Sequence, residues 1–299
     1  MLLKYPPRRV LFFSSFGGLT KLTDTSDEKA SKTLSELHNW RLIRNARGHA
    51  DAPLMVLSHG FGTDHRSWRL LLPDLLKHYD IGVYDLAGAG PNSRATFEDG
   101  RHTSITAFAD DLIAILDEQG ISSTKILTHS VSGMVALIAA SKRPEIFDHI
   151  SMIAPSPRYL NEGGYHGGFS QNDLDGLFGA MEAGYEDWAN GFAPVIVGDE
   201  FPLFVREFAS GLLAMPTQTA LKIARFIFQS DFRDILPKIT IPTTIIQPAR
   251  DPAVPLEVGH YLNAKLANST LHIIDSYGHL PQLTAPYEVL YCLKESMPE

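Results

Sequence analysis

Short apolar runs alternate along the chain with longer segments in which apolar residues recur every three or four positions. The apolar runs predict strands over residues 40–44, 54–58, 81–85, 125–129, 149–153, 240–247 and 270–274. The periodic segments predict helices over residues 68–78, 104–119, 133–141, 257–266 and 286–297. Because strands and helices alternate, we expect a mostly parallel sheet covered by helices on both faces.

The alternation stops between about residues 156 and 236. Helical patterns follow one another there without a convincing strand, over residues 173–181, 185–192, 203–213 and 217–228. Since this insert directly follows the strand predicted at 149–153, it can fold over the edge of the sheet where sites assemble. We therefore expect one α/β domain over residues 38–299, with a helical cap inserted at about 156–236.

Ser130 lies where the apolar run at 125–129 meets an alanine-rich helical segment. A sharp strand-to-helix turn lifts a serine hydroxyl out of the sheet and aims the helix N-terminal amides at a developing oxyanion. The usual pattern is G-x-S-x-G, whereas this chain has Thr128 and Ser132 at the two glycine positions. The junction therefore suggests a nucleophile, and the alternative for a serine at this place is a helix N-cap.

A base and an orienting carboxylate follow in the order serine, aspartate, histidine. Asp251 comes after the strand predicted at 240–247, and His279 comes after the strand predicted at 270–274. Both should therefore lie at the same edge of the sheet as Ser130. The strand at 54–58 ends in His-Gly-Phe-Gly, a loop type that donates a backbone amide to an oxyanion hole. The predicted donors are the backbone N–H groups of Phe61 and Val131.

Competing interpretations exist for several of these residues. Asp275 is closer than Asp251 to His279 in sequence, but a residue at a strand's end four places before the histidine is more often a turn former or loop cap, so we favour Asp251. His129 is expected to be a packed, hydrogen-bonded histidine. The sequence at 59–65 faintly resembles a metallohydrolase site, but Phe61 occupies its middle ligand position, so no metal is expected. The Gly-Ala-Gly at 88–90 is expected to be a structural turn rather than a dinucleotide loop.

Composition narrows the classes of partner. The chain has 299 residues, and the first 23 hold four of its 26 basic residues and none of its 34 acidic ones, so the remainder carries a net charge of −12. An acidic body disfavours nucleic acid or an anionic membrane as the main partner. Cys292 is the only cysteine, which excludes an internal disulfide. No apolar run approaches the length needed to span a membrane.

The N-terminal residues 1–22 are basic, hydroxylated and free of acids, in the manner of an organelle transit peptide. The alternative is a disordered extension or a mis-assigned start codon. We expect residues 1–37 to form an N-terminal extension and the protein to be cytoplasmic, with an organellar location as the alternative.

The chain resembles one branch of the α/β-hydrolases, which contains the bacterial stress-response regulator RsbQ and the plant karrikin and strigolactone receptors. The resemblance covers about residues 40–293. It rests on linked sequence strings, namely HGFGTD at 59–64, HSVS at 129–132, SPRYLN at 156–161, GGF at 167–169, GFAP at 191–194, FQSD at 228–231 and GHLPQ at 278–282. Several of these lie in the predicted cap, the part that varies most between hydrolase branches.

The resemblance implies an α/β-hydrolase fold with a four-helix cap and no cofactor. It implies Ser130 as nucleophile, His279 as general base and later acid, and Asp251 as its orienting anion. It also implies an apolar pocket for a small hydrophobic ester or butenolide-like lactone, lined by Phe61, Tyr159, Phe169, Leu177, Phe192, Phe208, Ile227 and Phe228. One departure is Thr128, where the family normally has glycine and where a branched side chain could crowd the nucleophile.

The expected function is therefore a serine hydrolase that proceeds through an acyl-enzyme. The alternative is a ligand sensor, in which slow hydrolysis or covalent capture shifts the cap and signals to a protein partner. A third possibility is a triad-bearing lyase or cofactor-free oxidoreductase on the same scaffold, because a fold does not determine a reaction.

Overall fold

The computed structural model describes residues 32–48 and 51–297. The expectations for a disordered or targeting N-terminus concern residues that lie almost entirely outside these ranges. The described residues form one compact unit. Helix α1 (Leu34–Leu37) belongs to this unit, because the backbone N–H and the hydroxyl of Ser35 both donate hydrogen bonds to Glu118. The folded unit thus begins before residue 38, the boundary expected from the sequence.

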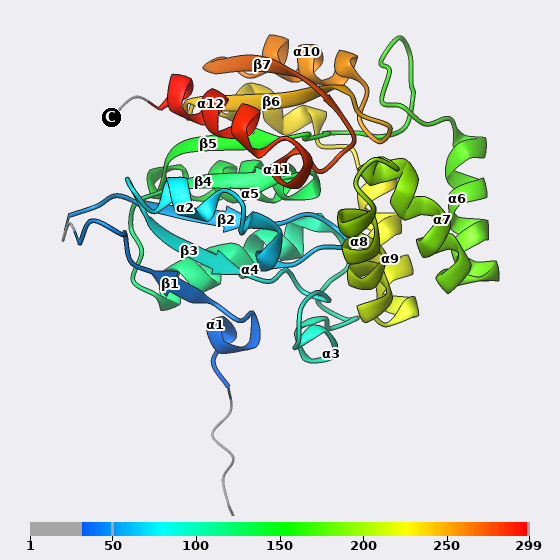
Figure 1. Ribbon diagram of the computed structural model, residues 1–299, viewed down its shortest axis with the longest axis horizontal. Helices are drawn as coiled ribbons and strands as arrows, with labels where there is room; N and C mark the ends of the chain where they lie inside the picture. The colour runs from blue at the N-terminus through cyan, green and yellow to red at the C-terminus, as the bar shows by residue number, and fades with distance from the viewer. Residues whose placement is uncertain (1–31, 49–50, 298–299) are drawn as a thin grey trace, which may run out of the picture. The chain divides into compact units, whose positions relative to one another are not determined.

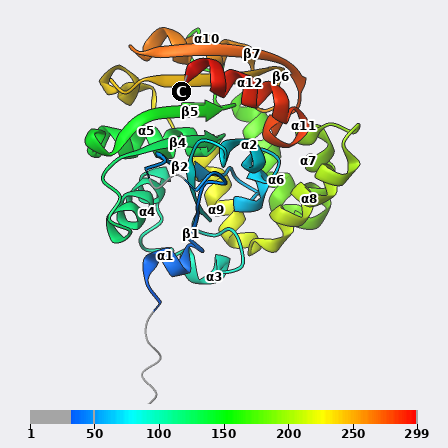
Figure 2. The ribbon, with the colours of Figure 1, turned by 60° about the vertical axis from the view of Figure 1, so that its left-hand side comes forward.

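A seven-stranded sheet forms the centre of this unit (Figure 1). Its strands, in spatial order, are β1 (Arg41–Ile43), β3 (Asp80–Tyr84), β2 (Leu54–Ser58), β4 (Thr124–His129), β5 (Phe147–Ile153), β6 (Thr243–Arg250) and β7 (Ser269–Tyr277). Only β1 pairs antiparallel to its neighbour, and all other pairs are parallel. Figure 2 shows β7 and β1 at opposite ends of this sheet. The predicted mostly parallel sheet is therefore confirmed.

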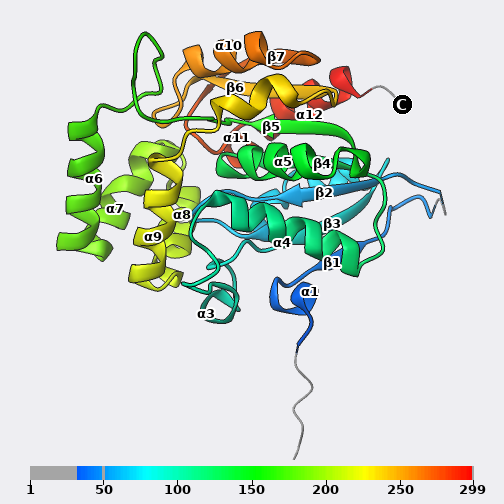
Figure 3. The same cartoon turned by 180° about the vertical axis from the view of Figure 1, so that it is seen from behind.

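Helices cover both faces of the sheet (Figures 1 and 3). One face carries α4 (Ile105–Glu118), α5 (Val131–Lys142) and α10 (Leu256–Lys265). The other carries α2 (Leu72–Leu75) and α12 (Pro286–Ser296), and the short helix α11 (Pro281–Thr284) directly precedes α12. Helix α5 is buried almost throughout because it lies against the central strands, which is why its sequence is apolar on all sides.

One predicted helix differs from the structure. The segment at 68–78 was expected to form a single helix, but the chain forms a 3₁₀ turn, His65–Trp68, and then the one-turn helix α2. Pro73 lies in the first turn of α2 and lacks a backbone N–H, so a helix cannot continue through it from the preceding turn. Within the part of the chain that the structure describes, no helix is long and apolar enough to cross a bilayer.

Four helices stand together at the edge of the sheet where the parallel strands end (Figures 1 and 3). They are α6 (Gln171–Ala183), α7 (Tyr185–Val197), α8 (Pro202–Ala214) and α9 (Thr217–Phe228). The two connections to this cap run side by side, because Arg158 and Asp231 form an antiparallel bridge. The side chains of the same two residues form an ion pair, with an N–O distance of 2.8 Å. The remaining short helix, α3 (Ser93–Thr96), follows β3.

Candidate active site

Ser130 occupies a strained turn between β4 and α5. Its backbone has φ 57° and ψ −125°, a conformation that side-chain-bearing residues rarely adopt. The backbone N–H of Ser130 donates to the carbonyl of Ile153 at 2.8 Å, which ties the turn to the end of β5. Although Ser130 precedes α5, its hydroxyl makes no capping hydrogen bond, so the N-cap alternative does not describe its side chain. The hydroxyl is available for chemistry.

Thr128 is accommodated within the sheet. Its side chain is fully buried, and its hydroxyl donates to the carbonyl of Ser151 on the neighbouring strand at 3.2 Å. The branched side chain that replaces the usual glycine is therefore held by β5. Beyond the turn, Gly133 packs against Pro155 so closely that an added Cβ would lie 2.9 Å from its ring. A side chain at residue 133 would therefore require Pro155 to shift.

Three side chains predicted from distant parts of the sequence meet at this turn. The Nε2 atom of His279 lies 2.8 Å from the Ser130 hydroxyl oxygen, and its Nδ1 atom lies 2.8 Å from the carboxylate of Asp251. That carboxylate is fully buried and accepts two further hydrogen bonds, from the backbone N–H groups of Ala253 and Val254. Asp275, the alternative partner, is 94 % exposed and pairs with Arg250 instead.

The loop after β2 brings a backbone amide toward the same place. Among the described residues, the N–H groups of Phe61 and Val131 donate to no other backbone or side-chain group. The loop is bent by Gly62, whose φ is 75°, and the Thr63 hydroxyl donates to the carbonyl of Gly60 at 2.8 Å. A helix N-terminus and a loop amide of this kind are what an oxyanion hole requires.

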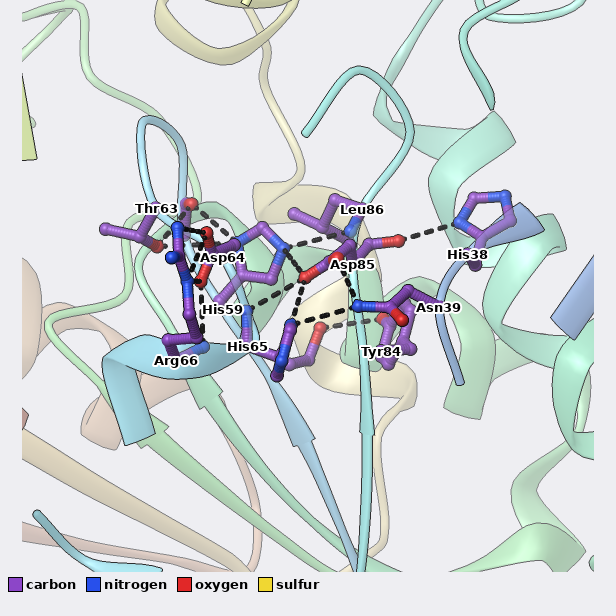
Figure 4. Close-up of polar contacts among 12 residues, drawn as sticks. His38, Asn39, His59, Thr63, Asp64, His65, Arg66, Tyr84, Asp85 and Leu86 are labelled. Carbon is purple, nitrogen blue, oxygen red and sulfur yellow. Dashed lines mark hydrogen bonds and ion pairs between the residues drawn. The ribbon is translucent and has the colours of Figure 1, made fainter. Parts of the chain in front are cut away.

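A buried polar network contacts this loop (Figure 4). His59 accepts a hydrogen bond at Nε2 from the backbone N–H of Leu86, and its Nδ1–H donates to the carbonyl of Gly60. Because both ring nitrogens are used in this way, the imidazole is neutral, and burial lowers its pKa accordingly. The Ser132 hydroxyl donates to the carbonyl of His59, which ties the loop to α5.

Asp85 is the centre of that network. Its carboxylate accepts hydrogen bonds from the backbone and ring of His65 at 2.9 Å each and from Asn39 at 3.1 Å. Burial tends to raise the pKa of Asp85, but the hydrogen bonds from His65 outweigh it and lower the pKa to about 2. Asp64 joins His65 and Asp85 within 4.8 Å, but its carboxylate is held by Arg66. The carboxylate and imidazole atoms of these three residues, which could bind a metal, already make hydrogen bonds or ion pairs within the protein.

A narrow apolar cavity opens beside the two candidate oxyanion donors. Its empty space, including the mouth, is about 330 Å³. Phe61, Val131 and Ile227 are the residues singled out in the sequence that line it. The lining also includes residues that the sequence did not single out, namely Leu86, Ala87, Ile105, Phe108, Met215 and Ile223. Several of these follow β3 or begin α4, and the rule that ligands bind beyond strand ends could have indicated them.

The other predicted pocket residues form two aromatic groups in and near the cap. Tyr159, Phe169 and Phe228 contact one another, with ring centroids 4.9 to 6.3 Å apart. Phe192 and Phe208 form a second pair at 6.3 Å. Leu177, on α6, is partly buried against the core. These six residues do not line the cavity beside Phe61, and their role in substrate binding stays a prediction.

Tyr159 adds a polar group to this apolar surround. Its side chain is almost fully buried, and burial raises the pKa of its hydroxyl, although hydrogen bonding with Ser130 partly opposes that effect. The phenol therefore keeps its proton beside the nucleophile. The sequence indicated Tyr159 only as one of the residues that line a largely apolar pocket.

Comparison with known proteins places this geometry in a family. Residues 53–286 match the model of the alpha/beta hydrolase fold. The chain belongs to the α/β-hydrolase family. It is 41 % identical over 246 residues to strigolactone esterase D14 of Arabidopsis thaliana, covering 82 % of this chain and 92 % of that protein. It is 38 % identical to karrikin insensitive 2 receptor CA of Petunia hybrida, covering 86 % and 94 %.

The structure is similar to that of a hydrolase from Oleispira antarctica, with a TM-score of 0.81 and 30 % identity over 87 % of this chain and 96 % of that one. These similarities confirm the fold class and the family branch that the sequence strings suggested. They also confirm the expectation of a hydrolase-family enzyme.

Proposed function

We propose that the protein is a serine hydrolase that cleaves a small hydrophobic ester or a butenolide-like lactone. The observation that carries this proposal is the continuous chain of two 2.8 Å contacts from Ser130 through His279 to Asp251. A hydroxyl is a weak nucleophile, and this arrangement supplies the base and the anion that activate it. The apolar cavity beside Phe61 supports an apolar substrate, as does the word esterase in the name of the Arabidopsis relative.

The proposed reaction has two halves. The Ser130 oxygen attacks the substrate carbonyl while its proton passes to Nε2 of His279, and the oxyanion accepts hydrogen bonds from the Phe61 and Val131 N–H groups. The C–O bond to the leaving group then breaks, and the leaving oxygen takes the proton from His279. A water next loses a proton to His279 and attacks the acyl carbon, and the Ser130 oxygen leaves with that proton. Asp251 keeps the imidazole in the correct tautomer throughout.

Intact-protein mass spectrometry tests this reaction directly. The protein is exposed to a synthetic butenolide or to 4-nitrophenyl acetate, and the added mass is mapped to a residue. We expect an increment on Ser130 or His279 and release of 4-nitrophenol, both abolished in Ser130→Ala. The matched control is Ser141→Ala, which removes a hydroxyl that bonds Ile138 at the other end of α5. Equal turnover by Ser130→Ala and the unmodified protein would refute the proposal.

A second candidate function is a ligand sensor that signals through the cap to a protein partner. It is favoured by one contact, in which the backbone N–H of His279 donates to the carbonyl of Ile196 in α7 at 2.8 Å. Gly278 fits so closely beneath the same helix that an added Cβ would lie 2.6 Å from the Val197 carbonyl. Displacement of α7 by a ligand would therefore act directly on the base.

The two functions predict different behaviour with the same ligand. A sensor should show a large ligand-dependent shift in melting temperature together with turnover far below the usual range of about 1–1,000 s⁻¹. An enzyme should turn a substrate over within that range. Turnover at ordinary enzyme rates, without a lasting shift in melting temperature, would exclude the sensor.

A further inference from the structure

His129, the residue before Ser130, is buried and is not needed for any step described above. Its Nε2 atom lies 2.7 Å from the backbone carbonyl oxygen of His279. A carbonyl oxygen only accepts, so Nε2 of His129 must carry the proton. The two rings lie close together, with centroids 5.0 Å apart at an angle of 53°. Consecutive residues of the elbow thus hold opposite ends of His279, its carbonyl through His129 and its imidazole through Ser130.

The other ring nitrogen of His129 faces the oxyanion loop. Among the described residues, His129 Nδ1 has no hydrogen-bond partner although it is buried. It lies against Gly60, where an added Cβ would be 2.5 Å from Nδ1 and 3.1 Å from the Ser130 Cβ. This close approach fixes Gly60, and with it Phe61, relative to the elbow. The His129 imidazole therefore contacts both the backbone of His279 and Gly60, the residue before Phe61.

Packing alone does not account for a histidine at this position. An unpaired buried nitrogen costs about 1–3 kcal/mol, which an apolar residue of similar size would avoid. Desolvation and the neighbouring His279 hold the pKa of His129 well below its usual range, so the ring is neutral. A neutral ring donates to the His279 carbonyl without placing a second positive charge beside the imidazolium that forms on His279.

We propose that His129 is a positioning residue for the proposed hydrolysis. Its Nε2–H holds the backbone of His279, so that the His279 imidazole stays in line with the Ser130 hydroxyl and with the Phe61 amide. The proposal rests on the proposed function for the reaction itself, but the hydrogen bond can be tested independently.

The kinetic test compares His129→Gln with His129→Met in the full chain, with 4-nitrophenyl acetate as substrate. The two side chains are similar in length, but only the glutamine amide can donate to the His279 carbonyl. A misplacement of about 1 Å costs roughly 100-fold in rate, so we expect His129→Met to lower kcat by about that factor with little change in KM. His129→Gln should recover at least about tenfold of this loss.

His149→Met is the matched control. His149 is also buried, and its Nε2 contacts Thr244 at 2.9 Å near the start of β5. Ser130 instead contacts Ile153, at the end of that strand. We expect this control to change the melting temperature without changing kcat. Unchanged kcat in His129→Met would overturn the proposal, as would equally slow turnover in both His129 variants at similar melting temperatures.

Nitrogen-15 NMR of the unmodified protein keeps the proposal testable if the variants do not fold. We expect His129 to be a neutral imidazole with the proton on Nε2 across the neutral pH range. A proton on Nδ1, or a charged ring, would overturn it. Ser130→Ala is assayed in parallel. If that variant still hydrolyses the ester, the proposed function fails, whereas the NMR result still decides whether His129 holds His279.

Discussion

Replacing Asp251 by asparagine changes one carboxylate oxygen to an NH₂ group at the end of the Ser130–His279 chain. One carboxylate oxygen of Asp251 accepts from the backbone N–H groups of Ala253 and Val254, at 2.8 and 3.1 Å. In Asp251→Asn the amide oxygen has to stay on these donors, because an NH₂ group there would face two N–H groups. The amide NH₂ would therefore point at Nδ1 of His279, where the second carboxylate oxygen is now 2.8 Å away.

This orientation sets the size of the effect. An NH₂ group donates, so Nδ1 of His279 would have to accept, and the ring proton would move to Nε2. Nε2 then faces the Ser130 hydroxyl as a donor and cannot take its proton. A triad with the wrong tautomer loses about 10⁴-fold in kcat, which corresponds to about 5.4 kcal/mol of transition-state stabilisation. Binding of the ester should change little, because Asp251 does not line the cavity.

The assay is the release of 4-nitrophenol from 4-nitrophenyl acetate at neutral pH. The matched control is Asp275→Asn, because Asp275 lies close to His279 in sequence, is 94 % exposed and, among the residues that the structure describes, pairs only with Arg250. We expect the control to retain its activity. A loss below about tenfold in Asp251→Asn, in a variant that melts like the unmodified protein, would refute the assigned role of the carboxylate.

Acid should weaken the fold through His149, because burial lowers its pKa from 6.5 to about 4. The unfolded chain binds that proton first, so stability falls as the pH drops from about 6.5 to 4. The free energy of unfolding should fall by about 2 kcal/mol by pH 4.5. Denaturant unfolding should show that His149→Met lacks this fall. Identical pH profiles of stability for the variant and the unmodified protein would contradict the prediction. Gly211→Ala should destabilise by about 1–3 kcal/mol and lower kcat, because the new Cβ would lie 2.1 Å from the Gly62 carbonyl beside Phe61. Gly176→Ala, with nothing within 4 Å, is the control and should not lower stability or kcat.

The parts of the fold that follow from local pattern could be predicted from the sequence. Strand β2 and helix α9 have the predicted bounds, because their apolar patterns end at clear polar or turn residues. The segment at 68–78 was wrong, since its apolar spacing continues through Pro73 although a helix cannot. The meeting of Ser130, Asp251 and His279 was predictable because all three follow parallel strands, whose ends lie at one edge.

The lining of the cavity was harder to predict. Which side chains line it depends on how the cap helices lie against the sheet, and a sequence period states only which face of each helix is apolar. Met215 and Ile223 therefore line the cavity, whereas Phe169 and Phe228 contact each other and Tyr159 instead. The strand alternation predicted a packed, hydrogen-bonded His129, but its partner, the His279 carbonyl, lies in a loop far away in sequence and has no local signal.

The cap enters and leaves the sheet through two adjacent segments that Arg158 and Asp231 join. Arg233 strengthens the same junction by pairing with both Asp231 and Glu162. An insertion whose two ends lie side by side can be exchanged as a cassette, since the strands beneath it need not shift to receive another. Selection for new ligands can therefore replace the whole cap while the sheet and the residues Ser130, His279 and Asp251 stay unchanged.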